Sequence, residues 1–491
     1  MHYTTASLSK CLASILILSL SGCAAVGPDY VAPKLSGKEV PDQWTSRTDV
    51  PPATDTAPTA KSEQVPQWWA ELSDPVLDQL VTEAFTNNPT IEAAVARLRQ
   101  SRAAFTQSAA TGSPAVSAGA SSQRATDSSG TLATDSWLSM NASWELDFFG
   151  SVRRAKEGAL AREGVQLATL ADVRVSLSAD VADAYLSHRA CQSRLELTEQ
   201  DLVSREATEK LTADSISAGF TAPYQGIRST ASVAEAKTLL AATRSQCEQI
   251  ENLLTRLSGM ARPGLMKLLA ERPTGLARLP VPKHFSIAIP REALMQRPDI
   301  RAAERAVAAA SADIGLAEAD RYPRIALNGA LGYTANGSSG SGALSFGTWS
   351  FGPSISLPIF DGGRRKAAVE IARSKYDESL ANYKSTTRRA IQEVEDALTR
   401  YAATHERAEN ARQSADQYQH FFDAVELRYR EGANNLLELE DARRAMLTAQ
   451  KTLLGVQHER LQAWIALNRA TGGAAQFDPD NTTPGLLSDK R

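Results

Sequence analysis

Two short stretches decide the fold, because apolar and polar residues alternate along both: DSWLSMNASWELDF at residues 135–148 and SFGTWSFGPSISLPI at residues 345–359. In the first stretch the apolar positions are Leu138, Met140, Ala142, Trp144, Leu146 and Phe148. A period of two residues is typical of a β-strand with one apolar and one polar face. Residues 323–336 show the same alternation and residues 114–126 a weaker one, so the sequence predicts four strands.

Each predicted strand is long enough to cross a lipid bilayer, since a transmembrane strand needs about 9–11 residues. The strands of a soluble β-sandwich alternate in the same way, so the pattern alone does not separate the two structures. Three of the chain's seven tryptophans lie in these segments, and tryptophan gathers at membrane interfaces. We therefore expect the four strands to lie in a membrane.

Four strands cannot close a barrel in lipid, where an open sheet edge leaves backbone groups unpaired. Other copies of the chain must then complete the wall. Two copies would supply eight strands, whose interior side chains largely fill, whereas three copies would supply twelve and leave a lumen. Pro353 lies inside a predicted strand, although proline removes a ladder hydrogen bond, and the sequence offers no reason for it.

The first 22 residues differ from the rest of the chain. Lys10 precedes the apolar run at 12–20, which is too short to span a bilayer and is typical of a signal peptide. The run ends in LSGC, which resembles the box at which bacterial lipoproteins are cleaved and acylated. We expect Cys23 to carry the lipid; the alternative is an ordinary signal peptide with an incidental cysteine. Ala24, in place of aspartate, indicates export to the outer membrane.

From about Gln67 the chain repeats itself with a period near 210 residues. NPTIEAA at 88–94 answers RPDIRAA at 297–303, and FGSVRR at 149–154 answers FDGGRR at 360–365. The predicted organisation is a lipoprotein signal peptide (1–22), a lipidated, proline-rich linker (23–66), a first repeat (67–259), an inter-repeat linker in an equatorial region (260–289), a second repeat (290–472) and a C-terminal tail (473–491).

The remaining segments of each repeat are rich in strong helix formers, and the long ones lack internal proline. The predicted helices are 75–111, 150–212 and 223–258 in the first repeat and 290–320, 362–429 and 435–471 in the second. A helix over 150–212 would extend for about 95 Å, but one over 223–258 for only about 54 Å. We therefore predict that two shorter helices lie end to end along each long one.

Cys191 and Cys247 lie on the heptad seams of two successive helices, each 28 residues from Gly219. Folding a helical hairpin at Gly219 would bring them level, so we predict a disulfide in an oxidising compartment. Two buried free thiols are the alternative. His188 lies on the same seam, where we expect a packed histidine rather than a ligand.

The residues reveal no catalytic constellation, so we expect no enzyme and no cofactor. The six histidines are scattered without metal-ligand spacing. Asp361-Gly362-Gly363-Arg364 lacks the spacing of a phosphate-binding loop and fits a tight turn between strand and helix better. The net charge of −3 gives no reason to expect nucleic acid as a partner.

The chain resembles the TolC-like outer-membrane factors, and within them the NodT-type efflux lipoproteins. The residues that carry the resemblance are Gly22-Cys23, VGPDY at 26–30, Trp68-Trp69, Asp74-Pro75, QRPDIRAAE at 296–304 and LPIFDGGR at 357–364. The resemblance implies a mainly α-helical chain with a membrane β-barrel portion. It further implies a homotrimer with a 12-stranded β-barrel in the outer membrane and a long periplasmic α-helical barrel. The implied partners are a periplasmic adaptor protein and an inner-membrane efflux pump, with the tube itself passive.

The resemblance also places a gate at the turn after residue 430. Leu437 and Asp441 would form constriction rings, and Arg444 would pair with an acid to keep the mouth shut. The family has leucine just before the aspartate, whereas this chain has Glu440, which leaves open which acid faces the lumen. Ordinary surface pairing at i, i+3 is the alternative. Three copies of the acids near one mouth would favour cations; these acids are Glu431, Glu438, Glu440 and Asp441.

Three functions fit the sequence. The first is an efflux duct for small molecules, and the second is a duct of the same build that serves protein secretion. The third is a structural coiled-coil lipoprotein without a lumen. The lipid anchor and the resemblance favour the first.

Overall fold

The computed structural model describes residues 25–33, 40, 44–45, 67–126, 130, 132–271, 279–280, 294, 297–338 and 341–473. The signal peptide, the predicted lipid site at Cys23 and nearly all of the C-terminal tail lie outside these residues. The chain divides into two compact units. The sheet unit comprises Met1–Lys34, Ala96–Ala168 and Arg301–Ser385, and the hairpin unit comprises Leu35–Val95, Thr169–Ile300 and Thr386–Arg491.

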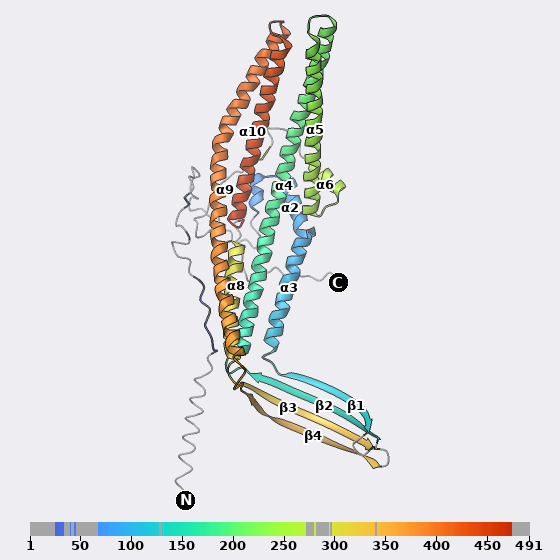
Figure 1. The fold of residues 1–491 in the computed structure, drawn as a ribbon, viewed down its shortest axis with the longest axis vertical. Coiled ribbons are helices and arrows are strands. Elements are labelled where there is room, and N and C mark those ends of the chain that lie inside the picture. Colours follow the sequence, from blue (N-terminus) through green and yellow to red (C-terminus); the bar gives the residue numbers. More distant parts are fainter. Residues whose placement is uncertain are drawn as a thin grey trace. The chain divides into compact units, whose positions relative to one another are not determined.

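The sheet unit contains the four predicted strands, which form one antiparallel sheet in the order β1-β2-β3-β4 (Figure 1). They are β1 (Ala115–Thr126), β2 (Leu132–Leu146), β3 (Arg324–Ser338) and β4 (Ser341–Ser356). The pairing of β2 with β3 joins the two repeats of the chain. The register places apolar residues opposite one another across the sheet, as in the row Met140, Leu331 and Trp349.

Side chains on both faces of this sheet are exposed. Between Ser345 and Ser356 every residue other than Gly352 is exposed, and the apolar face includes Trp349 at 80% and Phe351 at 71% exposure. A soluble sandwich would bury one of these faces. β1 and β4 form the edges of the sheet.

Trp137 and Pro353 occupy unusual positions in the strands. Trp137 is two residues from Ser139 and four from Asn141 in the same strand, so all three side chains lie on the polar face of the sheet. Trp137 therefore cannot belong to a belt of aromatic residues on the apolar face. A β-carbon on Gly119 would meet its ring at 3.6 Å. Pro353 lies in β4, opposite Leu327 of β3.

The helix predicted over 75–111 is two helices, α2 (Pro75–Asn87) and α3 (Pro89–Ala110). Proline fits the first turn of a helix, where no partner for its missing N–H is needed, and it drives the preceding residue into an extended conformation. Asn88 accordingly has φ −78° and ψ 122°. The helix predicted over 290–320 begins at Pro298 for the same reason and forms α8 (Pro298–Ala319).

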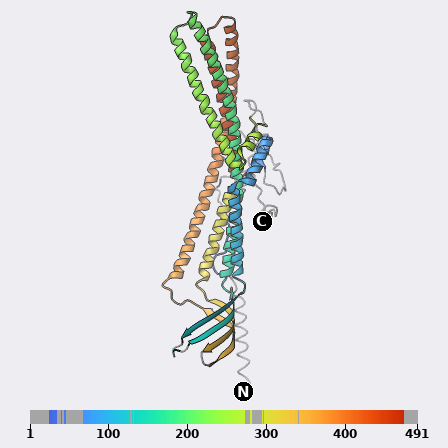
Figure 2. The same cartoon turned by 90° about the vertical axis from the view of Figure 1, so that its right-hand side faces the viewer.

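The other predicted helices are present within five residues of their expected ends. They are α4 (Ser151–Ser217), α5 (Pro223–Ser258), α9 (Arg364–Arg430) and α10 (Leu436–Ala470). α4 and α9 begin in the sheet unit and end in the hairpin unit. In the hairpin unit each turns back on the helix that follows it (Figures 1 and 2). Gly219 and Gly432 adopt the left-handed conformation at these two turns, with φ of 75° and 76°.

The contacts of the hairpin unit place its helices in the lateral order α5, α4, α10, α9. Arg244 pairs with Glu199 between α5 and α4. A cluster of buried side chains joins α4 to α10: Ala190, Leu197, Leu447 and Leu454. Arg407 pairs with Glu459 between α9 and α10. This order leaves α5 and α9 as the outer helices of the unit.

The predicted end-to-end helices meet at equivalent junctions in the two repeats. The Asn88 side chain donates to the carbonyl of Leu257 at the end of α5, at 2.8 Å. The Arg297 guanidinium donates to the carbonyl of Ala470 at the end of α10, at 2.7 Å. Both donors directly precede the proline that starts the next helix, and each satisfies a carbonyl that the ending helix leaves without a partner.

A cluster of large apolar side chains forms the core beside these junctions. It contains Trp68, Leu77, Leu80, Val81, Tyr185, Leu254, Leu265 and Trp464. Two short elements contribute to it, the 3₁₀-helix η1 (Trp68–Leu72) and α6 (Arg262–Leu269). α6 lies in the segment predicted as a linker. Among the described residues, no helix is both long and apolar enough to cross a membrane.

Parts of the predicted N-terminal linker contact the helices of the chain. The Val26 amide donates to the Phe149 carbonyl at 3.1 Å. The Thr45 amide donates to the Glu395 carboxylate at 2.7 Å. The linker has no apolar period that could have indicated these contacts.

Candidate functional site

The turn between α9 and α10 carries the residues predicted to form a gate. Gly432 follows the end of α9 in the left-handed conformation. Asn435 caps α10, because its side-chain oxygen accepts a hydrogen bond from the Glu438 amide at 3.0 Å. The Glu438 carboxylate accepts in return from the Asn435 side-chain amide at 3.3 Å. The bond to the Glu438 amide caps the first turn of α10, and the Glu438 carboxylate has a local structural partner in the Asn435 side chain.

Glu440 and Asp441, the two adjacent acids, have different surroundings. Glu440 is only 5% exposed and pairs with Arg443 one turn further along α10. Asp441 has an exposed carboxylate and pairs with Arg444. Leu437, Asp441 and Arg444 fall at spacings of four and three residues, so they share one face of α10, whereas Glu440 and Arg443 lie on a neighbouring face.

Arg443 links α10 to both neighbouring helices. Its guanidinium donates to the Ser204 hydroxyl of α4 at 2.6 Å and to Glu440 at 2.5 Å. It also lies 5.3 Å from the centre of the Phe422 ring of α9. A carboxylate as buried as that of Glu440 is costly unless it is paired. Sequence reasoning missed Arg443, although its i, i+3 spacing from Glu440 was a signal.

Arg444 lines a cavity of about 350 Å³ between α9 and α10. The other lining residues are Ala411, Ser414, Tyr418, Ala445, Thr448, Ala449 and Thr452. These side chains are mostly small, alanines and hydroxyl residues alike, and Tyr418 is 43% exposed. The exposed face of α10 near its tip thus combines an aliphatic residue, an ion pair and a shallow hollow lined by small side chains.

The turn between α4 and α5 has a different chemistry. Phe220, Tyr224 and Ile227 are 87%, 66% and 75% exposed. Exposed apolar side chains gathered at one end of a helical hairpin indicate a contact surface. Sequence reasoning did not single out these three residues, although two aromatic side chains beside a glycine turn could have drawn attention to them.

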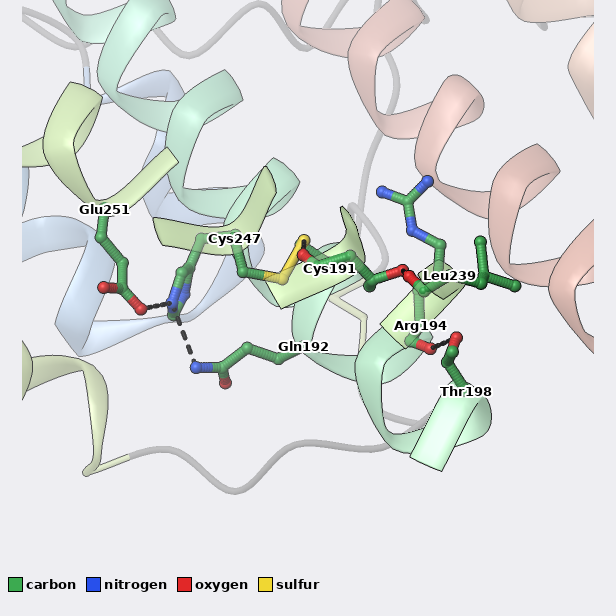
Figure 3. Close-up of a disulfide and its surroundings, with 9 residues drawn as sticks. Cys191, Gln192, Arg194, Thr198, Leu239, Cys247 and Glu251 are labelled. Carbon is green, nitrogen blue, oxygen red and sulfur yellow. Dashed lines mark hydrogen bonds and ion pairs between the residues drawn. A yellow bond between two sulfur atoms is a disulfide. The ribbon is translucent and has the colours of Figure 1, made fainter. Parts of the chain in front are cut away.

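In the hairpin that ends at the α4–α5 turn, a disulfide joins Cys191 of α4 to Cys247 of α5 (Figure 3). Both cysteines are buried on the seam between the helices. Figure 3 also shows Gln192 and Glu251 beside the disulfide. The bond ties the two arms of the hairpin together.

His188 is buried next to this disulfide, with 1% of its surface exposed. The Gln192 side-chain amide lies 3.1 Å from its Nε2 atom, which fits a neutral ring that accepts there. Burial, and secondarily the charge of Arg189, lowers the pKa of His188 to about 4. Glu251 lies 3.6 Å away, but Arg262 already pairs with it at 2.8 Å. These contacts describe a packed, neutral histidine.

The lowered pKa of His188 predicts a loss of stability in acid. An unfolded histidine has a pKa near 6.5, so between pH 6.5 and 4 the unfolded chain binds a proton that the folded chain does not. The folded state should lose up to about 3 kcal/mol as the pH falls through this window. Denaturant unfolding at pH 7 and pH 4.5 should show that His188→Gln removes this part of the pH dependence. An equal pH dependence in the variant would contradict the prediction.

No cluster of histidine, cysteine or acidic side chains among the described residues could hold a metal ion. The Asp361 carboxylate accepts from the amides of Gly363 and Arg365, at 3.0 and 3.2 Å. The start of α9 is therefore capped by the chain's own carboxylate, as expected for a turn rather than an anion site. Asp147 does the same for α4, at 3.1 Å from the Val152 amide.

Comparison with known proteins identifies relatives of this architecture. The family model "Outer membrane efflux protein" matches residues 80–260 and 289–473. The antibiotic efflux pump outer membrane protein ArpC of Pseudomonas putida is 32% identical, over 95% of this chain and 96% of its own. Nodulation protein T of Rhizobium leguminosarum bv. viciae is 31% identical, over 94% and 92%. The solved outer-membrane channel OprN is 31% identical with a TM-score of 0.76, over 92% of this chain and 99% of its own.

Proposed function

Since the chain belongs to the outer membrane efflux protein family and is an outer-membrane efflux channel with periplasmic helices, we propose that three copies form the passive exit duct of a tripartite efflux system. Cys23 carries a lipid that anchors each copy in the outer membrane. Small toxic compounds, antibiotics among them, leave through the bore. The duct docks with a periplasmic adaptor and an inner-membrane pump, which supplies the energy and selects the cargo.

The sheet is the observation that carries this proposal. Its two edges, β1 and β4, need partners inside a membrane, because no water is there to satisfy their backbone groups. Its apolar face suits lipid, and its polar face suits a water-filled bore. Three copies joined edge to edge would give twelve strands, β4 of one copy pairing with β1 of the next.

The hairpin unit supports a closable periplasmic end. In our proposal Leu437 and Asp441 line the constriction and Arg444 holds Asp441 in its closed pairing. Glu440 serves instead in the packing of α10 against α4, because its carboxylate is buried and bonded to Arg443. The cation preference of the mouth then comes from Asp441, with Glu431 and Glu438 nearby.

The two hairpin turns offer unlike surfaces to the adaptor. Phe220, Tyr224 and Ile227 give the α4–α5 turn an apolar surface. The α9–α10 turn presents the polar and charged side chains described above. We assign the apolar turn as the main contact for the adaptor, since buried aromatic side chains dominate binding at interfaces.

Deletion of the gene tests the efflux proposal against a role in protein secretion. The deletion strain should become hypersensitive to small toxic compounds, with at least a severalfold lower inhibitory concentration, while its secreted proteins stay unchanged. The wild-type gene should restore resistance, and a Phe220→Asp/Ile227→Asp variant should restore less than a Val203→Asp control. Val203 is also exposed, at 66%, but lies along α4. A strain that loses secreted proteins and keeps its resistance would support the secretion duct instead.

A further inference from the structure

Residues 25–30, named here the strap, lie in the sheet unit against α4 and α8. The strap begins two residues after Cys23. Its Val26 amide donates to the Phe149 carbonyl, at the end of β2 where α4 begins. The sequence predicts only a lipidated linker over this segment, so its contacts with α4 and α8 require a separate explanation.

Most hydrogen bonds of the Arg154 side chain, on α4, go to the strap. Its side chain is 3% exposed. The guanidinium donates to the carbonyl of Val26 at 3.1 Å, to that of Gly27 at 3.3 Å and to the Asp29 carboxylate at 2.8 Å. Its fourth partner is Glu157 on its own helix, at 2.8 Å. Arginine can hold three acceptors at once because its donors form a rigid planar fork.

Three close glycine contacts make the fit steric as well as polar. Gly27 has a φ of +89°, and a β-carbon there would collide with the backbone of Gly315 in α8. A β-carbon on Gly315 would in turn lie 2.8 Å from the Arg154 side chain. Gly150 is equally restricted, because a β-carbon there would collide with Ala25. Close approach of backbones is a recognised use of glycine.

The far end of the strap is held by the second repeat. The Tyr30 hydroxyl donates to the Glu304 carboxylate of α8 at 2.5 Å. Burial and the neighbouring Glu304 raise the pKa of Tyr30, so the hydroxyl keeps its proton at physiological pH. Tyr30 also packs on the small side chains Ala161 of α4 and Ala308 of α8. The strap therefore bridges one helix from each repeat.

Among the residues that the structure describes, none makes the equivalent contacts at the corresponding place in the second repeat. Arg365, the counterpart of Arg154, pairs with Asp361 in its own turn, at 3.1 Å. Phe360 is 92% exposed, whereas its counterpart Phe149 stacks on Tyr322 at 4.9 Å. The buried Arg154 and the restricted Gly150 of the first repeat thus have no equivalent at these described positions of the second, which argues that they exist for the strap.

We propose that Arg154 and the pair Gly27–Gly315 lock the strap at the β2–α4 junction and thereby fix where the lipidated end of the chain enters the membrane. The inference rests on the proposed lipidation of Cys23. Two residues span at most about 7 Å, so a locked Ala25 confines Cys23 to the neighbourhood of that junction. The lipid then inserts beside the barrel wall instead of sampling the membrane on a long tether.

Distances between spin labels test the lock in the acylated protein. One label replaces Val31, which is 75% exposed just after the strap, and the other replaces Leu160, which is 56% exposed on α4. Labelled protomers are diluted with unlabelled ones in trimers reconstituted into phosphatidylethanolamine–phosphatidylglycerol vesicles, so that each measured pair lies in one chain. The locked strap should give a narrow distance distribution.

Gly27→Ala should broaden that distribution severalfold, because its β-carbon expels the strap without changing the body of the protein. Arg154→Ala should do the same. In two matched control variants the distance distribution should stay narrow. Gly130→Ala places a side chain at a similar φ of +80° but with nothing within 4 Å. Arg153→Ala removes the adjacent arginine, which pairs with Asp147.

A distribution that stays narrow in both Gly27→Ala and Arg154→Ala would overturn the proposal. So would equal broadening in the controls, since the effect would then not be specific to the lock. Single-channel conductance of the same variants reports separately on the proposed function. The strap lies outside the conducting path in our proposal, so Gly27→Ala should conduct as the wild type does.

Discussion

Replacing Phe351 by arginine should prevent the chain from assembling in the outer membrane. Phe351 lies on the apolar face of β4, is 71% exposed in the single chain and stands opposite Gly329 of β3. An arginine on the lipid face of a barrel costs about 2–4 kcal/mol near the membrane midplane. A trimer carries this cost three times over, which is comparable to the whole stability of many folded domains.

Ser350→Arg supplies the matched control for this variant. Ser350 is the neighbouring residue on the polar face of the same strand and is also exposed. An arginine there would extend into water in the bore, so the variant should assemble normally. The measurement is the amount of trimer in outer-membrane fractions. Equal assembly of the two variants would mean that the faces are not divided between lipid and water.

Replacing Arg444 by alanine should open the periplasmic end of the duct. Arg444 pairs with Asp441 in the structure. Without it, three unpaired carboxylates would meet near the axis, each pair repelling by roughly 2 kcal/mol at about 8 Å and an effective dielectric constant near 20. Planar-bilayer recordings should show a several-fold higher conductance than the wild type at the same voltage.

The reason for this opening can be separated from simple loss of a side chain. Asp441→Asn in the same chain removes the repulsion, so the double variant should return toward the wild-type conductance. Arg443→Ala is a second control, since that arginine holds α10 against α4 and α9 and its loss should lower thermal stability more than it raises conductance. Wild-type conductance in Arg444→Ala would refute the assigned gate.

Much of the fold could be predicted from the sequence because its determinants are periodic. Alternation along residues 135–148 and 345–359 defines strands, and the positions of Cys191 and Cys247 relative to Gly219 follow from helical geometry alone. The bond between these two cysteines in the structure is the predicted one. The end-to-end arrangement of the shorter helices followed from their lengths, since a helix rises by a fixed amount per residue.

Features that depend on tertiary contacts could not be predicted in this way. The break at Pro89 could have been read from proline chemistry, but the bond from Asn88 to the end of α5 depends on a residue 169 positions away. Arg154 is an ordinary helical arginine in the sequence. Its role appears only when the strap, more than 120 residues earlier, is placed against it.

The gate shows the same limit within a single helix. A resemblance to a family suggested which residues of α10 matter, yet it could not place Glu440 relative to its neighbours. The structure buries Glu440 against Arg443, which also bonds Ser204 of α4, and leaves Asp441 exposed. Glu440 and Asp441 are adjacent in the helix. Helical spacing alone therefore does not show which of the two carboxylates faces the lumen and which packs against a neighbouring helix.

Single-molecule counting of subunits in conducting channels is the most direct test of the assembly. Purified protein carrying one fluorescent label per chain would be incorporated into a planar bilayer, where photobleaching steps and conductance are recorded at the same channel. The account predicts three bleaching steps wherever current flows, and a preference for cations that weakens in Asp441→Asn. Current through a channel with one or two subunits, or trimers that never conduct in any gate variant, would contradict it.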